Sequence, residues 1–270
     1  MAVQWSSKTA GQAIILRQSA TAWCLHNSEH EVDLPIGIYN TMAGKFISER
    51  RMEMISNNLA NSLTPGYKAS RPTINIVEDP SSPAPTNVNV FESYVYFSNA
   101  PLVKTDNALD VAIEGDGFFV VSMKDGNMYT RNGKFTLDQD KRLVTLDGSA
   151  VLGQNGEITI DARQGGDVRV ENDGSIFVDR ILVDRLKVVD FTDKKVLRNY
   201  GESKFVNTDP TAVETTPESF AVKQGFYEAS NVNVMNEMIH MMSTVRAYET
   251  YMKVDQSFSD MLEKLVNIGR

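Results

Sequence analysis

The sequence predicts an α+β protein of modular form. An N-terminal and a C-terminal helix are expected to pair as a coiled-coil-like α domain. Between them in the sequence lies a central all-β domain of many short strands. Apolar residues recur at steps of three and four within 36–60 and again from about residue 231 onward, as in amphipathic helices. Between these segments, short β-branched runs are separated by turn dipeptides. The 270 residues therefore divide into 1–33, 34–72, 73–222 and 223–270.

The first segment, 1–33, differs in composition from the rest of the chain. It holds both tryptophans and the single cysteine, Cys24. Its apolar run, 13–16, is ended by Arg17, whereas the apolar core of a secretory signal peptide has about 7–15 residues. We therefore expect no Sec signal, and we interpret the segment as a disordered leader, a cloning remnant or the product of an upstream translation start.

Residues 36–60 predict the N-terminal helix. Their apolar side chains fall mostly on one stripe, which the charged run 49–51 interrupts. The helix should end near Asn61, because the Thr-Pro-Gly sequence at 64–66 is a turn signal. The stripe consists of Ile38, Met42, Phe46, Met52, Ile55 and Leu59.

The 73–222 segment predicts a β-sandwich or an irregular barrel. Its alternating runs recur about every ten residues with no helical pattern between them. Asn-Gly and Asp-Gly dipeptides favour tight hairpins, because both turn residues take positive φ. The Pro- and Ser-rich stretch 78–87 indicates a linker or an extended surface loop. The dipeptides are Asp116-Gly117, Asp125-Gly126, Asn132-Gly133, Asp147-Gly148, Asn155-Gly156 and Asp173-Gly174.

The 223–270 segment predicts one long helix. Apolar side chains step by three or four from Val234 to Ile268, so a continuous helix would be about 50 Å long. Ser230 or Asn231 can cap its start. A helix of this length with one apolar seam needs a partner helix, although packing along the β domain is the alternative. The seam comprises Val234, Met238, Met241, Val245 and Tyr248, then Tyr251, Val254, Phe258, Met261, Leu265 and Ile268.

Composition argues against several classes of function. The formal net charge is −8 and the pI about 5.0, which disfavours binding to nucleic acid or to an anionic membrane. No apolar run approaches the length of about 18 residues that membrane insertion requires. One cysteine and three histidines leave little material for a metal site. We therefore expect no catalytic, cofactor-binding or metal-binding residues.

Two other classes of protein stay open from the residues alone. A glycan hydrolase would need two carboxylates about 5–10 Å apart, and nothing in the sequence pairs any. Glu114 and Asp116 stand beside glycines, where a hairpin turn explains them. A β-domain binding or adhesion module on a coiled-coil stalk would also fit the predicted architecture.

Three blocks of the sequence, in order, carry a family pattern. They are SNNLANSLTPGYKAS at 56–70, the stretch from NALDVAIEGDGFFVV to LVTLDGSAVLG within 107–153, and QGFYEASNVNVMNEMIHMMSTVRAYETYMKVDQ at 224–256. Together they resemble the flagellar axial proteins, which form the rod and hook, although Ser56 stands where that family usually has Ala. The matching signature residues are Asn57, Asn58, Leu59, Ala60, Asn61, Thr64, Pro65, Gly66, Tyr67 and Lys68.

The resemblance implies a structural, self-assembling subunit of the bacterial flagellar basal-body rod, with no enzymatic activity and no cofactor. Residues within 151–191 are most similar to the proximal rod proteins, with distal rod or hook proteins as the alternative. The partners would be copies of the chain itself and other axial proteins, with which it would form the tube that transmits torque. The flagellar type III apparatus would export it, without a cleaved signal peptide, to the rod that spans the periplasm.

In such a subunit, the signature at 57–67 and the seam of the C-terminal helix would make the assembly contacts. Each helix exposes an apolar stripe, and a lone subunit can cover it only with the other helix, so we expect both ends to gain order on assembly. The amides of Asn57, Asn58 and Asn61 would either satisfy carbonyls at the helix end or reach a neighbouring subunit.

Overall fold

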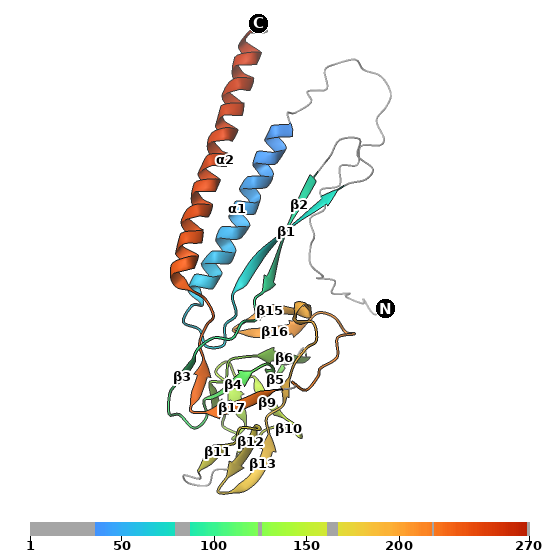
Figure 1. The fold of residues 1–270 in the computed structure, drawn as a ribbon, viewed down its shortest axis with the longest axis vertical. Helices are drawn as coiled ribbons and strands as arrows, with labels where there is room; N and C mark the ends of the chain where they lie inside the picture. Colours follow the sequence, from blue (N-terminus) through green and yellow to red (C-terminus); the bar gives the residue numbers. More distant parts are fainter. Residues whose placement is uncertain (1–35, 79–86, 124–125, 161–166, 218, 269–270) are drawn as a thin grey trace, which may run out of the picture. The chain divides into compact units, whose positions relative to one another are not determined.

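The computed structural model describes residues 36–78, 87–123, 126–160, 167–217 and 219–268 (Figure 1). The segment 1–33 and most of the predicted 78–87 linker lie outside these ranges. The described part is α+β, as predicted, with helices α1 (Ile36–Ala60) and α2 (Val234–Ile268) and a β-rich central region. The remaining elements are β1 (Ser70–Glu78), β2 (Asn87–Val95), β3 (Leu102–Lys104), β4 (Val111–Gly115), β5 (Phe118–Met123), β6 (Gly126–Thr130), β7 (Phe135–Leu137), β8 (Leu143–Thr145), β9 (Ala150–Gly153), β10 (Gly156–Glu157), β11 (Val168–Val170), β12 (Ser175–Val178), β13 (Ile181–Arg185), β14 (Val188–Val189), the 3₁₀ helix η1 (Lys194–Val196), β15 (Leu197–Gly201), β16 (Lys204–Asn207), β17 (Phe220–Gln224) and β18 (Phe226–Glu228).

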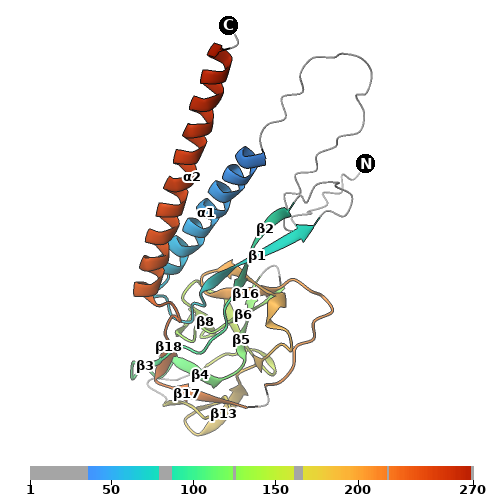
Figure 2. The same cartoon turned by 45° about the horizontal axis from the view of Figure 1, so that its top comes forward.

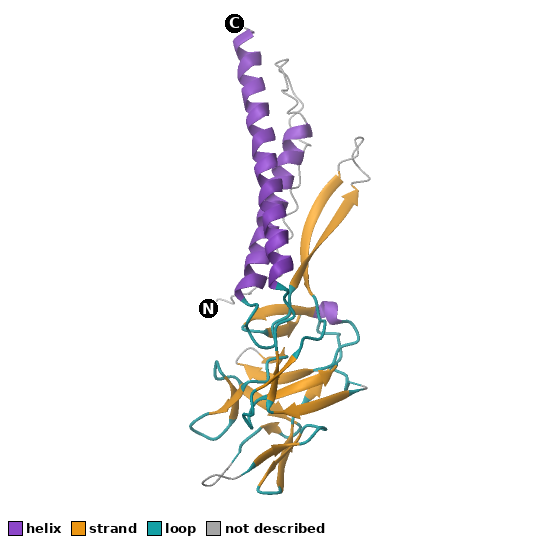
Figure 3. Cartoon of the chain, turned by 60° about the vertical axis from the view of Figure 1, so that its left-hand side comes forward, coloured by secondary structure: helices purple, strands orange, loops and turns teal. Residues whose placement is uncertain are grey.

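Helices α1 and α2 lie side by side and run in opposite directions (Figures 1 and 3). The Nζ of Lys45 in α1 lies 3.1 Å from a carboxylate oxygen of Asp255 in α2. Gly44 faces the ring of Tyr251 so closely that a Cβ at position 44 would overlap the ring. The close approach of the two helices at this level therefore depends on glycine.

The less exposed face of α2 follows a regular heptad spacing that includes polar residues. Thr244 is buried and Asp255 half-buried on this face, because positions three or four apart share one side of a helix. From the predicted seam, this face includes the half-buried Met241, Tyr248, Tyr251 and Phe258. The seam members Val234, Met238, Val245, Val254, Met261 and Leu265 are exposed in the single subunit.

The stripe predicted for α1 is also partly exposed. Met42 and Phe46 are 59% and 45% exposed, whereas Thr41 and Ser48 are buried. Small side chains let the helix backbones approach, so the larger ones point elsewhere. Neither α1 nor α2, the two long helices of the described residues, is long and apolar enough to cross a membrane.

The β domain is organised around a nine-stranded sheet, in which β6 lies beside β5 (Figure 2). The strand order β15-β16-β6-β5-β9-β8-β7 is extended by β10 on β9 and by β14 on β5. Strand β5 contributes to two apolar clusters. Phe119 and Val121 belong to one cluster and Phe118 and Val120 to the other, because alternate residues of a strand point to opposite faces. The centre of the sheet is therefore buried on both sides.

Smaller sheets connect the two ends of the central region. Strand β4 pairs with β17 and β3 pairs with β18, both antiparallel, so residues 102–115 lie against 220–228. Residues 226–228 fell in the segment predicted as the C-terminal helix, but they form a strand because their backbone pairs with β3. Strands β1 and β2 form a separate ribbon, and β11, β12 and β13 form a three-stranded sheet.

Three of the six predicted turn dipeptides connect paired strands, at 147–148, 155–156 and 173–174, and Asp125 of a fourth lies outside the described residues. Those at 116–117 and 132–133 do not, because β4 pairs with β17 and β7 with β8. Two tight turns at 179–180 and 202–203 were not predicted. Their non-glycine residues take positive φ values between 49° and 70°, so they lack the glycine signal.

The start of α2 differs from the prediction. The side-chain oxygen of Asn233 accepts a hydrogen bond from the N–H of Asn236 at 3.0 Å, which is an N-cap contact. The predicted caps were wrong because the helix begins later, at Val234. Ser230 accepts from the N–H of Val232 instead, and Asn231 makes the long-range contacts described below.

The contact between Gly44 and Tyr251 predicts the effect of Gly44→Val. The added side chain would push the helices apart and lower the free energy of unfolding by about 1–3 kcal/mol, measured by urea unfolding followed by circular dichroism. Ser56→Val places the same side chain at an exposed position of α1 and controls for the helix propensity of valine. Equal losses for the two variants would contradict the close approach.

Acid stability should depend on Asp147. Burial acts to raise its pKa, but hydrogen bonds from Lys204, Ser149 and Thr145 outweigh burial and lower the pKa to about 2. An unfolded aspartate titrates near about 3.9, so these contacts stabilise the fold above that pH and are lost as the pH falls toward about 2. We expect the melting temperature to fall less between about pH 5 and about pH 2.5 in Asp147→Asn than in wild type; parallel decreases would exclude this role.

Candidate functional site

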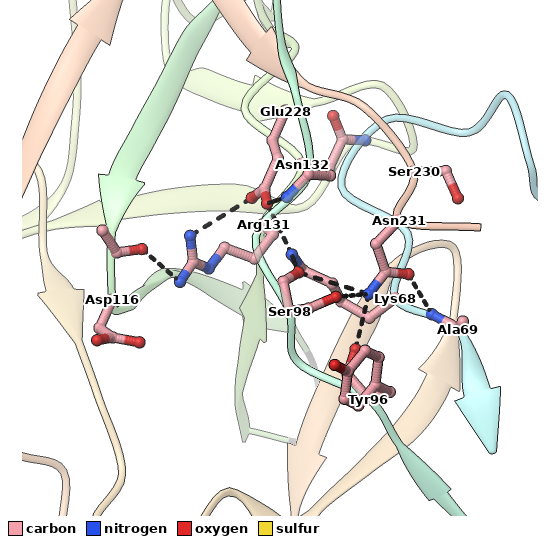
Figure 4. Close-up of polar contacts among 12 residues, drawn as sticks. Lys68, Ala69, Tyr96, Ser98, Asp116, Arg131, Asn132, Glu228, Ser230 and Asn231 are labelled. Carbon is pink, nitrogen blue, oxygen red and sulfur yellow. Dashed lines mark hydrogen bonds and ion pairs between the residues drawn. The ribbon is translucent and has the colours of Figure 1, made fainter. Parts of the chain in front are cut away.

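Three segments that are distant in sequence meet where the helices join the β domain. They are 58–70, which contains the end of the N-terminal signature, 131–132 in the central block, and 228–231, which precedes α2. We call the six residues whose side chains join these segments or order the chain beside them the junction; Figure 4 shows contacts of Lys68, Arg131, Glu228 and Asn231. The junction consists of Asn58, Tyr67, Lys68, Arg131, Glu228 and Asn231.

The centre of the junction is a carboxylate shared by two buried cations. The Oε1 of Glu228 accepts hydrogen bonds from the Nζ of Lys68 at 2.6 Å and from the N–H of Ala100 at 2.9 Å. Its Oε2 lies 3.4 Å from the Nη1 of Arg131. The three charged side chains are at most 4% exposed. Because its own protein occupies both oxygens, this carboxylate is suited to holding the fold together rather than to acting on a substrate.

Burial opposes the charged form of both cations. Desolvation lowers the pKa of Lys68, and the charge and hydrogen bond of Glu228 act in the opposite direction. Desolvation likewise lowers the pKa of Arg131, again opposed by Glu228. Removing the carboxylate would leave buried Lys68 without a counter-ion and Arg131 with only the more distant charges of Asp116 and Asp190, which costs far more than breaking an exposed ion pair.

Arg131 also attaches the junction to the β domain. Its Nη2 donates to the carbonyl oxygen of Gly115 at 2.9 Å, and its guanidinium carbon lies 5.3 Å from the ring centre of Phe118. Phe118 is fully buried in an apolar cluster of the nine-stranded sheet. A movement of the junction would therefore disturb both β4 and the core beside β5.

Asn231 connects the segment before α2 to the residues directly before β1 and directly after β2. Its Oδ1 accepts from the N–H of Ala69 at 2.7 Å, and its Nδ2 donates to the carbonyl oxygen of Tyr96 at 2.7 Å (Figure 4). The same Nδ2 lies 3.0 Å from the hydroxyl oxygen of Ser98. One side-chain amide thus satisfies a backbone N–H group on one segment and a backbone carbonyl group on the other.

Asn58 performs a similar role at the end of α1. Its side chain is fully buried, donates to the carbonyl oxygen of Ser70 at 3.0 Å, and accepts from the N–H of Ser70 at 3.0 Å and from the hydroxyl of Tyr67 at 3.1 Å. Burial and the nearby charge of Glu237 raise the pKa of Tyr67, so the hydroxyl stays protonated and continues to donate. The chain is thereby held in one path between α1 and β1.

The signature glycine is required by the junction. Gly66 has φ of 67°, and its N–H donates to the carbonyl oxygen of Glu228 at 2.8 Å. A Cβ at this position would overlap the backbone of Arg131 and Asn132. Both the positive φ and the close backbone contact exclude other residues without strain.

The rest of the signature closes the end of α1. The Nδ2 of Asn61 donates to the carbonyl oxygen of Asn57 at 2.9 Å, and its Oδ1 accepts from the hydroxyl of Thr64 at 3.2 Å. In the single subunit, the amides of Asn58 and Asn61 therefore make local contacts. Asn57 and Ala60 are exposed, and Leu59, Asn61, Thr64 and Pro65 are half-buried.

Of the three charged residues of the junction, Lys68 was singled out from the sequence, as part of the signature. Asn58, Gly66 and Tyr67 were site candidates, whereas Arg131 and Glu228 were not. The sequence does place Arg131 and Glu228 within largely apolar blocks. The spacing of apolar residues does not reveal, however, that these charged side chains are buried. Glu237, which is 2% exposed and pairs with Arg71 at 3.3 Å, was missed for the same reason.

The shared carboxylate predicts a large effect of Glu228→Gln. The neutral amide keeps the shape but leaves Lys68 and Arg131 without compensation, so the free energy of unfolding should fall by about 3–5 kcal/mol in urea titrations. Asp106→Asn is the matched control, because it neutralises the exposed ion pair of Lys104 and Asp106 and should change stability by less than about 1 kcal/mol. Similar losses in both variants would refute a central role for Glu228.

Three family models match the chain, and each covers one charged residue of the junction. The model "Flagella basal body rod protein" matches 48–68, which ends at Lys68. The model "Flagellar hook protein FlgE/F/G D1 domain" matches 112–178, which includes Arg131. The model "Flagellar basal body rod FlgEFG protein C-terminal" matches 223–268, which includes Glu228.

Whole-chain relatives give the same result. The flagellar basal-body rod protein FlgG of Buchnera aphidicola subsp. Schizaphis graminum is 34% identical over 79% of this chain and 92% of its own length. FlgF of Caulobacter vibrioides is 31% identical over 85% of this chain and 96% of its own length. FlgG of Bacillus subtilis is 28% identical over 86% and 98%, respectively. The family resemblance is thus confirmed: this chain belongs to the flagellar basal-body rod protein family.

Proposed function

We propose that this chain is a structural, self-assembling subunit of the flagellar basal-body rod, and that it polymerises through α1 and α2. Its relatives are named as basal-body rod proteins. The single observation that carries the proposed mode of assembly is the apolar surface that α2 leaves exposed. The partners are further copies of this chain and other rod and hook axial proteins.

The two helices form a coiled-coil-like pair within the subunit. The face of α2 that contains Met241, Thr244, Tyr248, Tyr251 and Asp255 has the three-four spacing of such a pair. Near Gly44, the buried residues of α1 are the small and polar Thr41 and Ser48, whereas Met54 and Ile55 are buried closer to its end. The pairing therefore orders both helices while leaving large apolar side chains outside the pair.

Those outside side chains form a second row on α2, which we call the outer strip. It consists of Met235, Met238, Met242, Val245 and Met252, which are between 36% and 67% exposed. The steps between them are three, four, three and seven, so they share one side of the helix. Apart from Glu249, which lies between Val245 and Met252 on the same side, this row is apolar, and an exposed apolar surface on a helix marks a protein-protein contact.

A different side of α2 carries a row of polar residues, beside which Ile239, Val254 and Met261 are also exposed. Asn236, Ser243, Thr250, Ser257 and Lys264 recur every seven residues and are all exposed. Because the apolar and polar rows are separate, a neighbouring helix can cover the outer strip without burying the polar row. Repeating one such contact with a rotation that does not close generates a helical tube.

The junction fixes the helix pair on the β domain during assembly. Rod subunits transmit torque, and a rigid connection at Lys68, Arg131 and Glu228 passes force from the helices to the β domain. Within the rod, we place the chain in the proximal part, as for FlgF, on the similarity of residues 151–191; FlgG is the alternative. The flagellar type III apparatus exports it to the basal body without a cleaved signal peptide.

Charge inserted into the outer strip tests this function. Val245→Asp should prevent incorporation into the rod, because assembly would bury a carboxylate without a partner. We expect at least about tenfold less subunit in basal bodies isolated from cells that carry only the variant, and loss of swimming.

Thr250→Asp is the matched control. It inserts the same charge about 140° around the helix, on the polar row, and should allow incorporation and motility. Both purified variants should unfold like wild type, because both positions are exposed. Normal incorporation of Val245→Asp, or equal failure of both variants, would overturn assembly through the outer strip.

A further inference from the structure

Exposed methionines are concentrated on the two helices. Of the 12 methionines in the chain, Met235, Met238, Met242 and Met252 belong to the outer strip and are 67%, 48%, 55% and 43% exposed. By contrast, Met128 in the β domain is 2% exposed. The outer strip therefore consists mainly of methionine, the one aliphatic side chain that mild oxidants modify.

We propose that these four methionines form an oxidation site that controls assembly of the subunit. The oxidant is hydrogen peroxide. The thioether sulfur attacks one peroxide oxygen, the O–O bond breaks, and one oxygen stays on the sulfur as a sulfoxide while the other leaves as water. The sulfur loses two electrons and the peroxide gains them, so no further reactant is required.

The consequence follows from the change in polarity. A sulfoxide replaces a flexible apolar side chain with a polar one that accepts hydrogen bonds. Burying four such groups against an apolar neighbour would leave their oxygens without partners. Oxidation would therefore weaken association through the outer strip, while the fold of the single subunit would stay intact because these side chains do not fill its core.

The contact between the outer strip and a neighbouring subunit restricts oxidation of the four methionines to free subunits. This inference rests on the proposed function, in which a neighbour covers the outer strip in the rod. Covered sulfurs are inaccessible to peroxide, so assembly protects them, and oxidation acts on subunits that have not yet assembled. Methionine sulfoxide reductases would restore the thioethers and make the block reversible.

The first part of the test maps the modified residues. The purified full chain is treated with hydrogen peroxide, and the sulfoxides are located by peptide mass spectrometry. Met235, Met238, Met242 and Met252 should be oxidised before Met128. Oxidation of Met128 at the same rate would overturn the proposed site.

The second part measures association. Sedimentation velocity compares wild type with a variant in which Met235, Met238, Met242 and Met252 are all replaced by leucine; Met42, Met261 and Cys24 are the same in both chains. Both should associate alike without peroxide, because leucine preserves the apolar surface. Peroxide should weaken association of wild type at least about tenfold and of the variant by less than about twofold, and methionine sulfoxide reductase should restore wild type.

The outcomes separate the two proposals. If the untreated wild-type chain does not associate, assembly through the outer strip is wrong and the oxidation control fails with it. If untreated wild type associates and the oxidised chain associates equally well, the oxidation control alone is wrong. Equal sensitivity of wild type and the leucine variant would also refute it, because the effect would then come from residues common to both.

Discussion

One carboxylate, that of Glu228, compensates two buried cations, Lys68 and Arg131, and the attachment of the helices to the β domain depends on this arrangement. Neither cation has another carboxylate within ion-pair distance among the described residues. The buried amides of Asn58 and Asn231 then hold the chain segments beside it. Without the carboxylate of Glu228, these segments would have to keep the charged side chains of Lys68 and Arg131 in a buried site.

The helices divide their surface between two contacts. On α1, Thr41, Gly44 and Ser48 are small enough to let α2 approach, as the contact of Gly44 with Tyr251 shows. Met42, Phe46 and the outer strip thereby stay exposed in the single subunit. A pair that buried all of its apolar residues internally would be more stable alone but would have less surface to offer a neighbour.

Local patterns predicted the elements, and long-range contacts explain what was missed. Helix periodicity and the turn signals located both helices and most hairpins, because spacing and turn chemistry act within a few residues. The seam on α2 could not be separated from the outer strip, because Thr244 looks polar and Val245 apolar, yet the first is buried and the second exposed. Similarly, the signature located Gly66, but only the fold reveals that Arg131 lies against it.

Because β3 pairs with β18 and β4 with β17, the β domain can complete its fold only after residues 220–228 have been added to the chain. A chain that emerges with its N-terminus first presents residues 68 and 131 long before residue 228. Until β17 and β18 are present, the buried cations Lys68 and Arg131 lack the carboxylate of Glu228. The apolar cluster that contains Phe119 also lacks Val222. Early closure of the β domain is therefore unfavourable, because its long-range strand pairs can form only once residues 220–228 are present.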